Sequence, residues 1–119
     1  MTFDGRILAF PGRRPAAKTF FTRAEMSQIL SLYALLVAAG KLKDYAIVEA
    51  RAFASFSFFG RSAEKPLYRI LKDPRRALKG GRFRVLGPEG LVLKEGDSLG
   101  SVLAFFYPKL LRLVPAAGE

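Results

Sequence analysis

The fold is decided by residues 22–50, which read TRAEMSQILSLYALLVAAGKLKDYAIVEA. Thr22 and Glu25 have the spacing of a capping box, in which each side chain accepts a hydrogen bond from the other residue's backbone amide, so a helix should begin here. Gly40 can adopt the left-handed conformation that ends a helix. Between these limits the apolar residues follow the i, i+3, i+4, i+7 spacing of one helix face: Met26, Ile29, Leu30, Tyr33, Leu36 and Val37.

The predicted helix has no charged residue from Met26 through Gly40, and Leu32 and Leu35 widen its apolar stripe. We therefore expect much of its circumference to be covered. Either a sheet of the same chain or a second subunit can cover it, and burial in the core is the simpler of the two interpretations.

After Asp44 the hydrophobic period changes from 3.6 toward 2, and β-branched and aromatic residues alternate between short turn signals. This pattern is typical of strands, which we place at residues 45–50, 54–59, 67–72, 83–86 and 91–94. The last two are joined by Gly87-Pro88-Glu89-Gly90, a tight hairpin loop that makes them antiparallel neighbours.

Asp97 or Ser98 can cap a final helix, which Pro108 should end or kink because proline has no amide hydrogen. The order of helix, about five strands and helix predicts a single α+β domain with an antiparallel sheet, and 119 residues suit one domain. We place this domain at residues 21–114, between a flexible basic arm (residues 1–20) and a frayed tail (residues 115–119).

The chain contains neither cysteine nor histidine. Disulfides, histidine-dependent catalytic triads and histidine or cysteine metal sites are therefore excluded, and the ten carboxylates are scattered without ligand-like spacing. We expect a protein that is not an enzyme and that uses no cofactor.

The uncharged run from Met26 to Gly40 is shorter than the roughly 20 residues that cross a bilayer, and residues 1–18 lack a signal-peptide core. We therefore expect no transmembrane segment and a cytoplasmic location.

The net charge of +10 is unevenly distributed, because residues 61–84 contain nine basic and two acidic side chains and residues 1–23 contain five and one. Such clustering creates a field that attracts polyanions. Strand alternation puts Arg82 and Arg84 on one face of their strand, and Arg69 joins them if its own strand pairs there. The sequence thus predicts a nucleic-acid interface made of Arg61, Arg69, Lys72, Arg75, Arg76, Lys79, Arg82 and Arg84.

Residues 73–81, DPRRALKGG, predict a single helical turn with Asp73 at its cap, Pro74 at its first position and glycines at its end. The free amides at such a start can hold a phosphate, although the carboxylate of Asp73 repels an anion. Phosphate capture and an ordinary basic turn both stay open.

Aromatic side chains are concentrated in the second predicted strand. Rings exposed beside basic residues can stack on nucleic-acid bases, and the candidates are Phe53, Phe56, Phe58 and Phe59. The period of 2 puts Phe56 and Phe58 on one face and Phe59 on the other, so at most one or two rings are free to stack. Packing in the core is the alternative.

Several stretches of the chain together resemble a known family. They include FxRxEM (21–26), VAAG (37–40), DYAI (44–47) and EKPLYRI (64–70), of which the last two are the most specific. Across residues 20–104 the sequence is similar to the bacterial domain of unknown function family 2794. The resemblance implies a single-domain bacterial cytoplasmic protein, and it carries over no activity, cofactor or catalytic residue.

Two main functional hypotheses follow. The first is a nucleic-acid-binding protein, regulatory or nucleoid-associated, with DNA and RNA both open as partners. The second is an interaction or adaptor module that forms a homodimer or binds an acidic protein through its apolar helix face or through residues 103–114. A peripheral membrane protein that uses residues 6–18 and 110–114 is a third possibility.

Overall fold

The computed structural model describes residues 18–61 and 64–113. Its first helix, α1 (Arg23–Ala38), is capped at both ends as the sequence predicts. The amide of Thr22 donates to Glu25 Oε1 over 2.8 Å, and the amide of Glu25 donates to Thr22 Oγ1 over 3.1 Å. Gly40 follows the helix with a φ of 78°, and the amides after the helix end bond back to its last carbonyls. Local hydrogen bonds therefore fix the length of α1.

A five-stranded antiparallel sheet follows, with the strands side by side in chain order. The strands are β1 (Asp44–Glu49), β2 (Ala54–Phe59), β3 (Tyr68–Lys72), β4 (Phe83–Leu86) and β5 (Val92–Gly96). The predicted limits are exact for β2 and β4, and the other three strands differ from their predicted limits by one or two residues. The prediction of an α+β fold with an antiparallel sheet is confirmed.

The C-terminal helix is divided into α2 (Leu99–Leu103) and α3 (Phe106–Leu113). The expected break occurs, but one turn before Pro108, and the chain stays helical after the proline. The reason is that Pro108 cannot donate to the carbonyl of Ala104, which accepts instead from the amide of Tyr107 over 3.2 Å. Proline is tolerated in the first turn of α3, where its amide would lack a helical partner.

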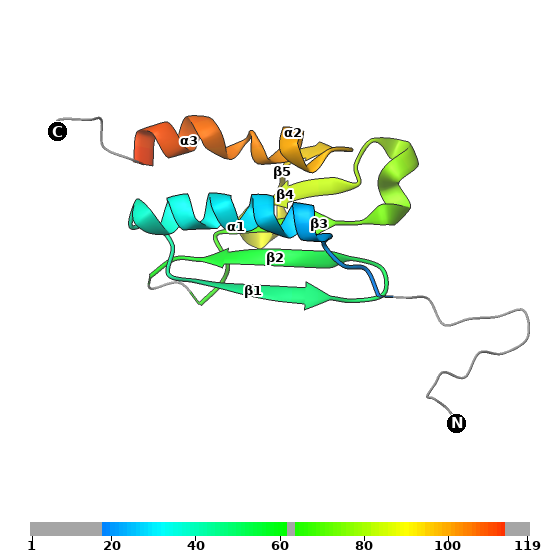
Figure 1. The fold of residues 1–119 in the computed structure, drawn as a ribbon, viewed down its shortest axis with the longest axis horizontal. Helices are drawn as coiled ribbons and strands as arrows, with labels where there is room; N and C mark the ends of the chain where they lie inside the picture. Colours follow the sequence, from blue (N-terminus) through cyan, green and yellow to red (C-terminus); the bar gives the residue numbers. More distant parts are fainter. Residues whose placement is uncertain (1–17, 62–63, 114–119) are drawn as a thin grey trace, which may run out of the picture.

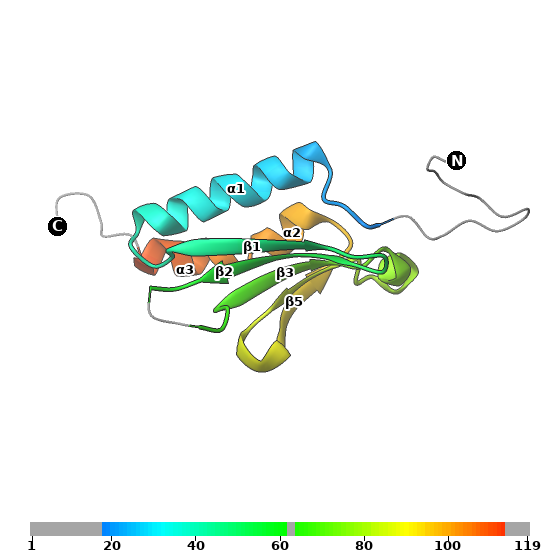
Figure 2. The same cartoon turned by 90° about the horizontal axis from the view of Figure 1, so that it is seen from below.

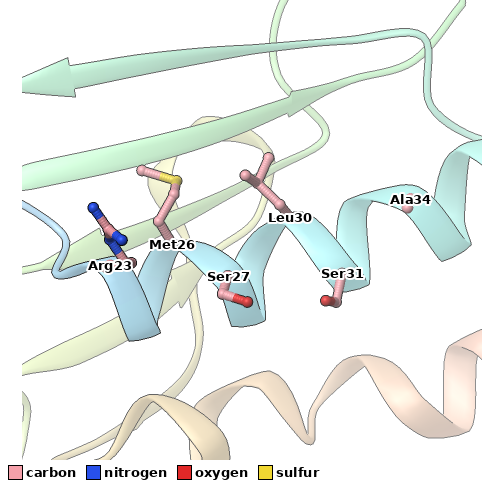
Figure 3. A pocket seen from close by; sticks show the side chains of 6 residues that line it. All are labelled: Arg23, Met26, Ser27, Leu30, Ser31 and Ala34. Atoms are coloured by element: carbon pink, nitrogen blue, oxygen red, sulfur yellow. The ribbon is translucent and has the colours of Figure 1, made fainter.

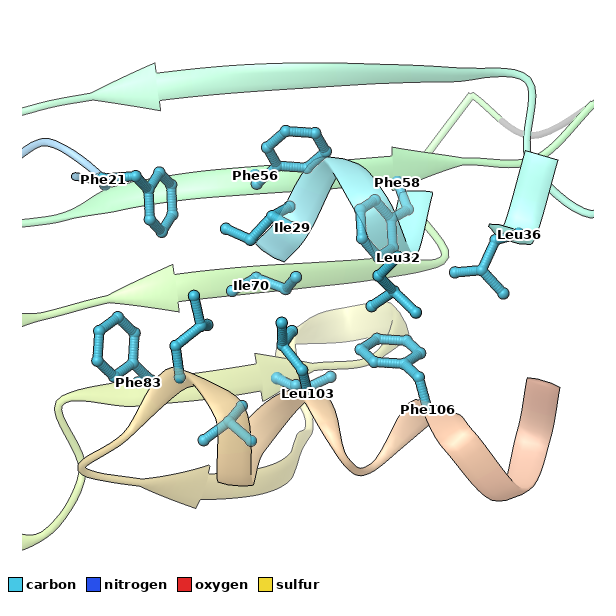
Figure 4. Packing of buried hydrophobic residues seen from close by; sticks show 14 of the residues in the cluster. Phe21, Ile29, Leu32, Leu36, Phe56, Phe58, Ile70, Phe83, Leu103 and Phe106 are labelled. Atoms are coloured by element: carbon cyan, nitrogen blue, oxygen red, sulfur yellow. The ribbon is translucent and has the colours of Figure 1, made fainter. Parts of the chain in front are cut away.

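The helices lie on one face of the sheet and leave the other face open (Figures 1 and 2). Between the two layers is the hydrophobic core, where side chains from α1, α2, α3 and the central strands interdigitate (Figure 4). Its largest fully buried members are Phe56, Phe58, Phe106, Ile29, Ile70, Val85 and Val102. Strand alternation explains which sheet residues belong to the core, because every second side chain of a strand points toward the helices.

α1 is covered less than its apolar composition predicts. Only Ile29, Leu32 and Leu36 are buried, whereas Leu30, Leu35 and Val37 are between 39% and 49% exposed. The core of the same chain therefore covers only part of the circumference, and coverage by a second subunit stays a prediction. The sheet contacts one side of the helix, and α2 and α3 lie beside it without enclosing it.

Most of the predicted basic arm (residues 1–20) and all of the tail (residues 115–119) lie outside the described residues. Thr19 is described, and it is tied to the turn between β1 and β2. Its amide donates to the carbonyl of Ala50 over 2.7 Å, and its hydroxyl donates to the carbonyl of Arg51 over 2.9 Å. Among the described helices, none combines the length and the apolarity that a bilayer span requires.

Candidate nucleic-acid interface

The open face of the sheet carries two of the predicted basic residues at its centre. β3 pairs with β4 so that Leu71 lies opposite Arg84 and Arg69 lies opposite Leu86. Directly opposite residues of an antiparallel pair share a face, so Arg69 and Arg84 lie together on the open side with Leu71 between them. Arg69 Nε also donates to Ser57 Oγ over 3.3 Å. The sequence-based expectation that Arg69 joins the face of Arg84 is therefore confirmed.

Asp73 is the negative centre of this region. It is 3% exposed, and its carboxylate accepts hydrogen bonds from Arg75 N, Nε and Nη2 over 3.1, 3.0 and 3.2 Å. Arg84 Nη2 lies 3.5 Å from the same carboxylate. The side-chain hydrogen bonds from Arg75 are the main reason why the pKa of Asp73 is held below its ordinary value. Asp73 is thus an anion at neutral pH and neutralises part of the charge around it.

The predicted turn is the short 3₁₀ helix η1 (Pro74–Lys79), which ends at Gly80 with a φ of 76°. Asp73 caps it as expected, and its carboxylate already accepts the hydrogen bond that the amide of Arg75 could donate to a phosphate. Phosphate capture by the free amides of this turn is therefore not supported, and its basic side chains are what it offers to a partner.

η1 lies at the same end of the molecule as the turn between β1 and β2 (Figures 1 and 2). Arg51 from that turn and Arg75 from η1 line one shallow hollow of about 270 Å³. We call this region the basic end and define it by Arg51, Arg75, Arg76, Lys79 and Arg82. Lys79 and Arg82 are exposed, and no ion pair with either is found among the described residues. The basic end therefore contains both paired and unpaired cations.

Two predicted site residues lie elsewhere. Lys72 points to the helix layer, where Nζ lies 2.7 Å from Glu25 Oε1 and donates to the carbonyl of Phe20 over 2.8 Å. Because the Lys72 side chain is only 13% exposed, its charge joins α1 to the sheet and is withdrawn from the surface. Arg61 follows β2 and lies at the opposite end of the sheet from η1, about 20 Å away for a six-residue strand.

Ion pairs reduce the charge of the basic segment. Arg76 Nη2 lies 3.6 Å from Glu95 Oε1, and Lys65 Nζ lies 4.0 Å from Glu89 Oε2. Glu25, Glu89 and Glu95 lie outside residues 61–84 and neutralise part of the excess of +7 there, in which Asp73, the partner of Arg75 and Arg84, is already counted. Among the described residues of this segment, the cations without an ion pair are Arg69 on the open face, Lys79 and Arg82 at the basic end, and Arg61 at the opposite end of the sheet.

The aromatic residues offer little stacking surface. Phe56 and Phe58 are fully buried beneath α1 and α3, where they form edge-on contacts with each other and with Tyr33 and Phe106. Base stacking on these two rings is therefore excluded. Phe59 is half-buried on the open side, as the alternation of β2 predicts.

The sequence analysis did not predict Arg51 of the basic end or Leu78, which lies beside it in η1. Arg51 lies in a stretch with balanced charge, and only the return of β2 and β3 brings it beside η1. Leu78 is 100% exposed at the tip of η1, between the basic side chains of the turn. Its apolar type gave no signal, because a leucine in a capped turn is normally expected to pack inward.

Comparison with known proteins assigns the chain to a family. The sequence model of DUF2794, described as a protein of unknown function, matches residues 19–103. The chain belongs to the DUF2794 family. The family resemblance noted in the sequence is thereby confirmed. No significant match was found among the curated proteins or among the solved structures.

The matched region of this DUF2794 protein contains α1, all five strands and α2, and therefore also the open face and the basic end. No group of three or more acidic side chains in residues 18–61 and 64–113 is placed to hold a metal ion.

Proposed function

We propose that this DUF2794 protein binds nucleic acid and that the basic end is the contact surface. The observation that carries the proposal is that Arg51, from the turn between β1 and β2, and Arg75, from η1, line one hollow, while the exposed Lys79 and Arg82 follow Arg75 within the same short stretch of chain. Guanidinium groups bind phosphate oxygens with paired hydrogen bonds, and clustered cations release counterions from a nucleic-acid backbone. Arg69 and Arg84 extend the positive surface along the open face.

Leu78 adds an apolar contact to this surface. Leu78 is fully exposed beside these cations, and some nucleic-acid-binding proteins insert such apolar side chains between base steps. In this proposal the cations of the basic end hold phosphates while Leu78 contacts the sugar or base edge beside them.

The test is binding of labelled duplex DNA, single-stranded DNA and structured RNA across a salt series. Lys79→Glu/Arg82→Glu removes two exposed cations that have no acidic partner in the described structure. If both contact phosphates of duplex DNA, the slope of log affinity against log salt should become shallower by about 1.8, because each phosphate contributes about 0.9. A ligand that binds clearly more tightly than the others at physiological salt identifies the class of nucleic acid.

Lys41→Glu/Lys94→Glu is the matched control, because both lysines are exposed, both lie outside the basic end, and the change in net charge is the same. The control variant should keep most of the affinity of the wild-type chain. Equal losses in the two double variants would mean that only the net charge attracts the ligand, and the proposed contact surface would be wrong.

A second candidate is a protein-interaction module. A groove of about 260 Å³ between α1 and the C-terminal helices is lined by Leu35, Leu103 and Tyr107, of which Leu35 and Tyr107 are about half exposed. Charge substitutions at Leu36 or Phe106 cannot test this function, because both residues are in the core. Leu35→Lys, with its fold checked by circular dichroism, is the suitable probe of a partner in this groove.

A further inference from the structure

β1 is the edge strand of the sheet, and its outer side has no paired strand among residues 18–61 and 64–113. The amide of Ala50, one residue after β1, donates to the carbonyl of Phe53 over 2.9 Å, so this residue faces β2. Because hydrogen bonding alternates along an antiparallel strand, the backbone groups of Tyr45, Ile47 and Glu49 point away from β2. The edge therefore presents a row of donors and acceptors without strand partners, in which the amide of Tyr45 donates to Asp44 Oδ1 over 2.7 Å and would exchange this local bond for one to a paired strand.

The side chains of β1 are apolar and exposed as well. Tyr45 and Ile47, on the side of the helices, are 43% and 40% exposed, and Val48, on the open side, is 47% exposed. Soluble proteins protect such edges with lysine, proline or a bulge, and Tyr45–Val48 contains none of these. Exposed apolar side chains on an unprotected edge are the pattern of a strand that pairs with another chain.

α1 continues the same apolar surface. Tyr33 contacts Tyr45 with ring centroids 5.1 Å apart, which places this flank of the helix beside β1. Figure 3 shows Met26 and Leu30 pointing from α1 toward the strands, and they line a hollow of about 620 Å³ along the helix. Val37 is two helical turns beyond Leu30 on the same face and is 40% exposed.

We propose that a second copy of this chain covers this surface, with β1 pairing antiparallel to β1 across a two-fold axis. The two sheets would then form one ten-stranded sheet. The axis is perpendicular to the sheet, so the α1 helices of both copies lie on the same side and bring Met26, Leu30 and Val37 together. This inference goes beyond nucleic-acid binding and does not depend on it.

The hydrogen-bonding pattern restricts the register of the dimer. A residue whose backbone groups point outward must pair with a residue of the same kind in the second copy. One residue must therefore lie directly opposite its own copy, and the two-fold axis passes between these two equivalent residues. An axis at Ile47 would place Tyr45 opposite Glu49 of the second copy. An axis at Ala46 places Tyr45 opposite Ile47, which joins the exposed apolar side chains, and it brings the small Ala46 side chains together at the closest point.

Charge selects the same register. With the axis at Ala46, the side chain of Lys43, one residue before β1, comes near Glu49 of the second copy, which gives two pairs of opposite charge at the ends of the apolar row. The amide of Lys43 donates to the carbonyl of Phe59 over 2.9 Å, so only its side chain takes part at the edge. With the axis at Ile47, Lys43 would lie opposite Arg51, which is repulsive. The β1 edge is therefore self-complementary in one register, and this is the argument for a second copy as its partner.

The experiment is sedimentation equilibrium of the full chain over a range of concentrations, with the fold of every variant verified by circular dichroism. Wild type should sediment as a dimer that dissociates on dilution. Ile47→Lys should be monomeric, because it places a charge in the centre of the apolar row. Val92→Lys is the matched control: Val92 is a 44% exposed residue of β5, at the opposite edge of the sheet, and this variant should dimerise like wild type.

A charge exchange tests the register even if Ile47→Lys disturbs the fold. Lys43→Glu should weaken the dimer about tenfold, because it converts two weak attractions into repulsions, and Lys43→Glu/Glu49→Lys should restore it. A wild-type chain that stays monomeric overturns the proposal, whatever else occupies the edge. The proposal is also overturned if Ile47→Lys still dimerises and Lys43→Glu/Glu49→Lys does not restore the dimer that Lys43→Glu weakens, since the interface then lies elsewhere.

Discussion

Replacing Asp73 with alanine should lower the free energy of unfolding by about 3 kcal/mol. The lost cap of η1 accounts for about 1 kcal/mol. The Arg84 side chain is 19% exposed, and in the variant its guanidinium is left without a counter-charge. This costs about 2 kcal/mol, less than the roughly 3–5 kcal/mol lost when one partner of a fully buried ion pair is removed. Arg75 is 70% exposed and adds little. For a domain of this size the melting temperature should fall by about 12–24 °C.

The assay is urea and thermal unfolding followed by circular dichroism. Asp97→Ala is the control, because this exposed carboxylate accepts only a long 3.4 Å hydrogen bond from the amide of Arg82, and the loss should be within about 0.5 kcal/mol. Asp73→Ala/Arg84→Met should recover part of the loss, because it removes the stranded charge. The reasoning is refuted if Asp73→Ala costs less than about 1 kcal/mol, or if the double variant is no more stable than the single one.

Three further predictions follow from the structure. Lys72→Met should destabilise the fold by about 2 kcal/mol, because Glu25 loses its buried partner, yet the affinity for nucleic acid measured in the salt series should not change. Gly40→Ala should cost about 1 kcal/mol, because its φ is 78° although nothing obstructs a methyl group, whereas Gly100→Ala, inside α2, should be neutral or stabilising in the same unfolding assay. Because the pKa of Asp73 is lower in the folded state than its unfolded value of about 3.9, its contribution to stability is present above that pH and is lost on further acidification; Asp73→Asn should lack this part of the pH dependence of unfolding.

The sequence was sufficient for the fold because its signals are local. The capping box of Thr22 and Glu25, the period of 2 in β2 and the loop before β5 each act within a few residues, and antiparallel neighbours need no long-range rule. Pro108 breaks the helix four residues before its own position, at the carbonyl of Ala104, because a residue with an amide hydrogen at position 108 would have donated to that carbonyl. That displacement follows from helix geometry and could have been predicted.

The candidate site was predicted less well because charge along a chain does not indicate which side a residue takes. Lys72 was included for its charge, although alternation from Arg69 places it with Ile70 on the helix side. That signal was present in the sequence. Arg51, in contrast, reaches η1 only through the pairing of three strands, and no local pattern predicts that contact. The exposed flank of α1 was missed because apolar periodicity shows that a face is hydrophobic and not what covers it.

The strictly sequential order of the strands has a consequence for synthesis on the ribosome. α1 emerges first, but the residues that cover its stripe, Phe56, Phe58 and Ile70, come later in the chain. At translation rates of about 5–20 residues per second, the 34 residues between Leu36 and Ile70 take about 2–7 s. During this interval the nascent helix exposes an apolar surface, so chaperones that recognise such stripes should bind the chain before β3 is complete, and each later strand should then add directly to its predecessor.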